Sequence, residues 1–146
     1  MGVVADAVLA KGGEVVGVIP EDIVRLEVAH EGLTEQRVVG SMHERKALME
    51  KLSDGFIALP GGFGTMDELC EMVTWAQLGL HKKPVGLLNT AGYYDKFIEF
   101  VDHASGEGFV KQKLRGLLLE AKTPEQLLAL FDAHRPVDAR RWLRHP

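Results

Sequence analysis

The sequence predicts an α/β fold, a doubly wound parallel sheet with helices on both faces. Short apolar runs rich in β-branched residues alternate with segments that open on helix-capping residues, the pattern of βαβ units. The 146 residues have the usual size of one domain, and 46% hydrophobic with 26% charged residues is ordinary for a globular chain. We therefore expect a single domain over residues 1–146, with a polar, loosely held tail at 136–146.

The first half of the chain is predicted to hold two helices around one strand. Residues 3–10 have the composition of a helix end, which Lys11-Gly12-Gly13 closes. The apolar run at residues 14–20 is typical of a buried parallel strand. Residues 21–40 are charged and weakly periodic, so we expect an irregular segment there. Ser41 and Glu44 then form a Ser-x-x-Glu capping box that starts a helix ending at Leu52.

The second half alternates strands with helices. Strands are predicted at residues 55–59, 84–88 and near 117–119, and helices at 65–80, 93–104 and from 123 onward. The helix at residue 65 opens on a second capping box, Thr65 with Glu68, and the last helix has Pro124 at its favoured first position. Only about four strands are readable, fewer than in an average sheet, and the chain opens within a helix. We therefore expect the first strand of the fold to be missing from this sequence.

Composition excludes several classes of protein and site. Lys and Arg number 17 against 21 Asp and Glu, a net charge of −4, which excludes the basic footprint of a general nucleic-acid binder. The single cysteine, Cys70, excludes an intramolecular disulfide, and its apolar surroundings in the sequence indicate an inert core residue. Without a signal peptide or an apolar run of membrane-helix length, we expect a soluble, cytoplasmic protein with no membrane partner. The six histidines lack metal-ligand spacing, so no metal is expected.

The segment Pro60-Gly61-Gly62-Phe63-Gly64-Thr65 joins a predicted strand to a predicted helix. Glycines let a ligand approach the backbone closely, and the N–H groups at a helix start favour an anion such as phosphate. A tight strand-to-helix turn is the alternative explanation for the glycines. The segment lacks the lysine of a Walker A loop, and Asp67 stands where a dinucleotide fingerprint needs glycine. A mononucleotide or sugar phosphate is the ligand class that fits.

Two charged residues are candidates for chemistry. Arg45 falls in the middle of an apolar stripe on its predicted helix, which is formed by Met42, Leu48, Met49 and Leu52. Burying an unpaired charge is costly, so Arg45 needs a carboxylate or a ligand as its partner. The alternative is that its side chain extends from the helix end to solvent. Glu68 is either the acid of a capping box or a carboxylate that accepts ribose hydroxyls or activates water. The two helices follow adjacent predicted strands, so we expect Arg45 and Glu68 to meet over one pocket.

The predicted helix after the glycines is apolar around more of its circumference than one sheet face needs. A second apolar partner is therefore expected, and the same helix of another subunit would make a homodimer; a fully enclosed central helix is the alternative. The residues concerned are Met66, Leu69, Cys70, Met72, Val73, Trp75, Ala76 and Leu78.

Two motifs, Ser41-Met42-His43-Glu44-Arg45-Lys46-Ala47 and Leu59-Pro60-Gly61-Gly62-Phe63-Gly64-Thr65-Met66-Asp67-Glu68, closely resemble those of the LOG family. These are the cytokinin riboside 5′-monophosphate phosphoribohydrolases of cytokinin biosynthesis. The resemblance continues through residues 74–79, 81–89, 92–94 and 108–109. Family members begin with a strand and a Gly-Gly-Gly loop, which this sequence lacks.

The resemblance implies a Rossmann-like, usually dimeric enzyme without a cofactor. It would cleave the N-glycosidic bond of AMP or an N6-modified AMP and release the free base and ribose 5-phosphate. Arg45 and Glu68 match the family's catalytic pair. The positions that match substrate contacts are Glu27, Arg45, Lys46, Gly61, Gly62, Phe63, Gly64, Thr65, Met66, Asp67, Glu68 and Thr74.

The same fold and glycine loop also resemble carriers of the molybdenum cofactor, which hold a phosphorylated pterin without cleaving it. A non-catalytic binding protein is therefore the alternative, and the arginine–glutamate pair favours the hydrolase. A lysine decarboxylase is disfavoured, because the chain is small for that chemistry and no lysine stands out as a pyridoxal site.

Overall fold

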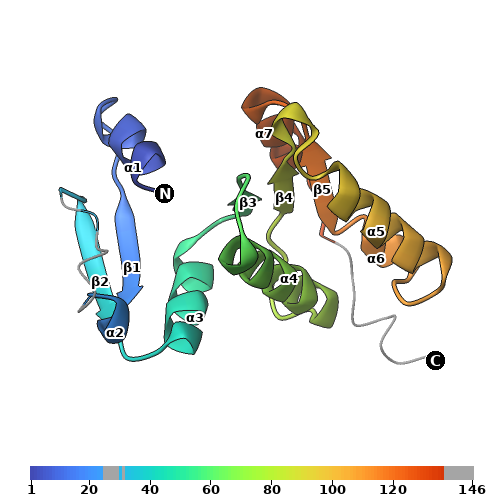
Figure 1. Cartoon of the computed structure of the whole chain (residues 1–146), viewed down its shortest axis with the longest axis horizontal. Coiled ribbons are helices and arrows are strands. Elements are labelled where there is room, and N and C mark those ends of the chain that lie inside the picture. The colour runs from blue at the N-terminus through green and yellow to red at the C-terminus, as the bar shows by residue number, and fades with distance from the viewer. Residues whose placement is uncertain (25–29, 31, 137–146) are drawn as a thin grey trace. The chain divides into compact units, whose positions relative to one another are not determined.

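The computed structural model describes residues 1–24, 30 and 32–136, which form two compact units that divide between Ser53 and Asp54 (Figure 1). Glu27 and all but the first residue of the predicted tail lie outside the described residues. Each unit contains parallel strands and helices, so the α/β prediction is confirmed.

Where the structure describes it, the first unit pairs two parallel strands and carries three helices. Its elements are α1 (Gly2–Leu9), β1 (Val16–Pro20), α2 (Glu21–Val24), β2 (Glu35–Val39) and α3 (Met42–Leu52). Val16 lies beside Glu35, and the register continues to Pro20 beside Val39. The predicted first helix, first strand and capped helix are therefore confirmed.

The strand β2 corrects the prediction of an irregular segment over residues 21–40. Its sequence, Glu-Gln-Arg-Val-Val, is mostly exposed and lacks the apolar alternation that would have marked it as a strand. Backbone pairing with β1 defines the strand, and polar contacts lie at its start: the Val15 N–H donates to the Thr34 hydroxyl at 2.9 Å, and within β2 Arg37 Nε donates to Glu35 Oε1 at 2.7 Å. The short helix α2 was also missed, because four residues are too few for a periodic pattern.

The start of α3 follows the predicted capping box with one difference. Ser41 is the N-cap, and its hydroxyl accepts from the Glu44 N–H at 3.1 Å. The Glu44 carboxylate accepts in return from the N–H of Gly40, one residue before the cap, at 2.8 Å. A capping box closes on the cap residue itself, so here it is widened by one residue.

The second unit is built on a three-stranded parallel sheet in the order β3-β4-β5. Its elements are β3 (Phe56–Ala58), α4 (Phe63–Leu78), β4 (Val85–Leu88), the 3-10 turn η1 (Thr90–Gly92), α5 (Asp95–Gly106), α6 (Gln112–Arg115), β5 (Leu118–Ala121) and α7 (Pro124–Asp132). The strands and longer helices lie at the predicted places. Thr123 caps α7 as predicted, with its hydroxyl accepting from the Gln126 N–H at 3.3 Å.

Helices cover both faces of this sheet. On one face, Val85 and Leu87 of β4 pack with Leu69 and Met72 of α4 and with Tyr94 ahead of α5. Gly86 lies between them and faces the other side, because successive strand residues alternate. A Cβ placed on Gly86 would lie 2.7 Å from Leu127 Cδ1 and 2.8 Å from Phe131 Cε1, so α7 lies directly against this face. The predicted double winding is present within this unit.

A buried histidine fixes the connection between α4 and β4. His81 Nδ1 accepts from the Lys83 N–H at 3.2 Å, so Nε2 carries the proton and donates to the Met72 carbonyl at 2.9 Å. The ring also packs on Phe56 of β3, with the ring centres 5.3 Å apart. One side chain therefore joins α4, its exit loop and the neighbouring strand.

The contact between Gly86 and α7 yields a stability prediction. Gly86→Ala should lower the free energy of unfolding by about 1–3 kcal/mol, because the new methyl group must displace the packed Leu127 and Phe131 side chains. Urea unfolding followed by circular dichroism measures the change. Gly106→Ala is the control: it lies at the end of α5 with no atom within 4 Å of the new Cβ, so stability should not fall. Equal losses in both variants would contradict the close approach of α7.

Candidate active site

The glycine segment leaves the carboxyl end of β3 and enters α4. Gly62, in extended conformation at φ −94° and ψ −151°, is the N-cap, and its carbonyl accepts from the Met66 N–H at 3.1 Å. The helix thus begins at Phe63, two residues before the predicted start. The predicted capping box of Thr65 and Glu68 is wrong, because both residues lie inside the helix. As glycine, the N-cap supplies no capping side chain to the first-turn N–H groups.

The three glycines of this segment do two different things. A Cβ on Gly61 would collide with the Thr65 hydroxyl and lie 3.0 Å from Thr65 Cβ, so Gly61 is needed for packing. A Cβ on Gly62 or Gly64 would meet no atom within 4 Å. None of the three has a positive φ, so the backbone does not require glycine at positions 62 and 64. Those two positions leave open space beside the helix start.

Two tyrosine hydroxyls hold this segment from a distant part of the sequence. Tyr93 donates to the Gly61 carbonyl at 2.8 Å, and Tyr94 donates to the Leu59 carbonyl at 2.5 Å. Sequence reasoning gave these tyrosines no role. Their position after the predicted strand at 84–88 could have indicated this role, because the carboxyl ends of parallel strands, and so the segments that follow them, lie at the same end of a sheet.

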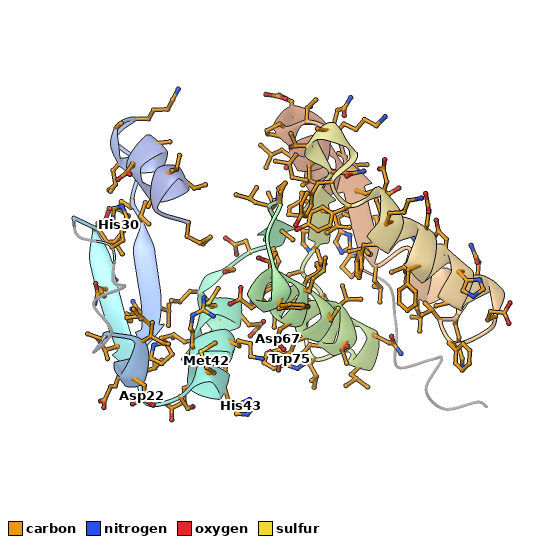
Figure 2. The ribbon with its side chains drawn as sticks, in the orientation of Figure 1. Asp22, His30, Met42, His43, Asp67 and Trp75 are labelled. Atoms are coloured by element: carbon orange, nitrogen blue, oxygen red, sulfur yellow. The ribbon has the colours of Figure 1, made fainter. Side chains whose placement is uncertain are left out.

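Glu68 is half-buried in the second turn of α4. Since Gly62 rather than Thr65 is the N-cap, Glu68 does not fill the position of a capping acid. Residues three and four apart are neighbours on a helix surface, which places Glu68 next to Thr65 and Gly64. Asp67, labelled in Figure 2, is exposed on the same helix. Glu68 therefore lies on the same face of α4 as Gly64 and Thr65, about one turn further along the helix.

Arg45 lies in the first unit and has a backbone partner there. Its Nε donates to the Val18 carbonyl of β1 at 3.1 Å, and the residue is half-buried. Lys46 is the buried residue of α3, with 8% exposed, whereas Met42, labelled in Figure 2, and Leu52 are exposed. The predicted apolar stripe is therefore wrong at its two ends. That Arg45 and Glu68 serve one pocket stays a prediction.

The remaining candidates are distributed along α4. Phe63, at the first helical position, is 97% exposed, and Met66 packs against the core of the second unit. The Thr74 hydroxyl donates to the Cys70 carbonyl of its own helix at 2.7 Å.

Cys70 is exposed, which corrects the prediction of a core cysteine. The buried residues of α4 are Leu69, Met72 and Ala76, and Cys70 is not among them. Partial burial, followed by the charge of the Asp67 carboxylate, raises the pKa of the Cys70 thiol. The thiol form is therefore favoured at neutral pH, and a nucleophilic role is disfavoured.

A hollow of about 570 Å³ lies at the carboxyl ends of β4 and β5. Its lining includes Asn89 and Glu120, which already have partners: Asn89 donates to Asp95 at 2.8 Å, and Glu120 accepts from Arg115 at 3.3 Å. The glycine segment is not part of the lining.

Over the described ranges, no three His, Cys, Asp or Glu residues form a cluster that could hold a metal ion, and no helix is long and apolar enough to span a membrane.

Comparison with known proteins identifies the family. Residues 1–131 match the family model described as "Possible lysine decarboxylase". The chain is 49% identical over 136 residues to the cytokinin riboside 5′-monophosphate phosphoribohydrolase LOG of Oryza sativa subsp. japonica, covering 93% of this chain and 56% of that protein. It is 46% identical over 140 residues to LOG3 of Arabidopsis thaliana, a protein of the same activity name, covering 96% of this chain and 65% of that protein. This chain thus spans between just over half and just under two thirds of the length of these relatives, and it belongs to the LOG family.

Proposed function

We propose that the protein hydrolyses the N-glycosidic bond of AMP or N6-modified AMP, releasing the base and ribose 5-phosphate. The observation that carries the proposal is the glycine-capped start of α4 with Glu68 one turn further along. The names of the relatives, phosphoribohydrolases that share 46–49% of their aligned residues with this chain, support the same reaction.

The glycine segment is the proposed phosphate site. The first-turn N–H groups of α4 and the positive end of its dipole favour an anion, and the open space at Gly62 and Gly64 admits it to the backbone. Further proposed substrate contacts are Glu27, Lys46, Gly61, Phe63, Thr65, Met66, Asp67 and Thr74, on the family resemblance.

Glu68 and Arg45 are the proposed catalytic residues. Cleavage of an N-glycosidic bond builds positive charge on the ribose in an oxocarbenium-like transition state. A carboxylate at Glu68 stabilises that charge and orients or deprotonates the attacking water. Arg45 anchors the phosphate or the ribose.

A homodimer and a cytoplasmic location complete the proposal. Apolar side chains that a second subunit would cover are exposed at the two ends of α4, by Phe63 and Leu78, and just beyond it by Leu80. The single cysteine supports a reducing compartment.

The function is tested by incubating the protein with AMP and with N6-isopentenyl-AMP and following free base by chromatography. Release of base supports the hydrolase, and the ratio of the two rates separates a cytokinin enzyme from a general AMP nucleosidase. Tight binding of a phosphorylated pterin without base release would support the carrier instead.

Glu68→Gln should lower the rate of base release at least about 100-fold while nucleotide binding persists, because the amide retains the shape but loses the charge and the basicity. Initial rates and the dissociation constant for AMP measure the two effects. Glu99→Gln, on the exposed surface of α5, serves as the control and should leave both unchanged. Full turnover in Glu68→Gln would refute the catalytic assignment.

Gly64→Ala should weaken AMP binding without loss of stability. Alanine favours a helical position by about 1 kcal/mol over glycine, but its methyl group occupies the space proposed for phosphate. Calorimetric titration and thermal unfolding measure the two quantities. The comparison variant is Gly61→Ala, which should destabilise the fold through its collision with Thr65. If Gly64→Ala binds AMP as tightly as the parent chain, phosphate does not contact this part of the segment.

A further inference from the structure

Two consecutive tyrosines hold the backbone of the glycine segment and of the residue before it. The Tyr93 and Tyr94 hydroxyls donate to the carbonyls of Gly61 and Leu59, which lie on either side of Pro60. The rings meet edge to face, 5.0 Å apart at 89°. Tyr94 is buried, with 1% exposed, whereas Tyr93 is 55% exposed. The chain contains only these two tyrosines.

The two hydrogen bonds differ in what they control. A trans peptide unit is planar, and its C=O and N–H groups point in opposite directions. Fixing the Gly61 carbonyl therefore fixes the direction of the Gly62 N–H, which points away from Tyr93. The Leu59 carbonyl belongs to the peptide unit that continues into Pro60, and proline has no N–H. Tyr94 thus anchors the chain, whereas Tyr93 also orients a donor at the start of α4.

The turn after β4 places both tyrosines accurately. The buried Asn89 accepts from the Tyr94 N–H at 2.7 Å and donates to Asp95 at 2.8 Å. Ala91 and Gly92 follow each other in the left-handed region, at φ 53° and 71°. A left-handed alanine costs about 1–2 kcal/mol, so the surrounding contacts must impose this conformation. The position of the Tyr93 hydroxyl therefore depends on a turn whose backbone conformation few other residues would adopt.

We propose that Tyr93 is a positioning residue for the phosphate of a nucleoside 5′-monophosphate, acting through the Gly61–Gly62 peptide. The inference rests on the proposed phosphate site of the glycine segment. Donation to the Gly61 carbonyl also polarises the peptide, because linked hydrogen bonds strengthen one another, so the Gly62 N–H becomes a better donor to an anion. Tyr94 supports the fold but does not set the affinity for phosphate.

The experiment compares Tyr93→Phe with Tyr94→Phe, which remove the same atom from neighbouring residues. Affinities for AMP and for adenosine are measured by calorimetric titration on the full chain, together with the melting temperature. We expect Tyr93→Phe to reduce the preference for AMP over adenosine about 3- to 10-fold, the range of one modest hydrogen bond, with adenosine affinity unchanged. Tyr94→Phe should lower the melting temperature more and keep the AMP preference, because Tyr94 is buried and its hydrogen bond is less exposed to solvent than that of Tyr93.

The outcomes separate this inference from the proposed reaction. An equal loss of AMP and adenosine affinity in Tyr93→Phe, an unchanged AMP preference in that variant, or a parent protein that does not prefer AMP would each overturn the positioning role. If the parent protein releases no base from AMP, but its AMP preference depends on Tyr93, the hydrolase proposal fails and the positioning role stands. Ser105→Ala, which removes a hydroxyl from the far end of α5, is the control and should leave the preference unchanged.

Discussion

Burial of β4 on both faces is the constraint on which the second unit depends. Its apolar residues pack on α4 and the start of α5, and Gly86 between them admits α7 from the other side. With its faces covered, β4 forms parallel backbone pairs with β3 on one side and with β5 on the other. Parallel pairing brings the carboxyl ends of the strands to the same end of the sheet. The glycine segment after β3 and the tyrosine turn after β4 can therefore meet, although more than thirty residues separate the bonded groups.

Apolar patterning predicted the elements that are buried and missed those that are not. Four strands could be predicted because each is an apolar run in the sequence: residues 14–20, 55–59, 84–88 and 117–119. The strand β2 was missed because its sequence is mostly polar and exposed, and its pairing with β1 is made by the backbone, which apolar patterns do not report. The start of α4 was misplaced because glycine, which leaves no signal in a capping pattern, is the N-cap.

The candidate site was predictable in its chemistry but not in its supports. The glycines, Glu68 and Arg45 stand out by residue type and local spacing, and their assignment as site residues stays a prediction. The roles of Tyr93 and Asn89 depend on contacts between distant segments, which local patterns do not encode. Burial was also misjudged on helices: Lys46 is buried and Cys70 is exposed, because which face a helix buries is decided by its neighbours.

The left-handed pair Ala91 and Gly92 has a consequence for protein engineering. The glycine segment, with Leu59 before it, cannot be transplanted into another scaffold as a contiguous peptide, because the groups that hold its carbonyls come from residues 89–95. A graft must carry both pieces, including a turn whose backbone most residues adopt only at a cost. The smallest portable unit is therefore two strand ends and the two segments that follow them.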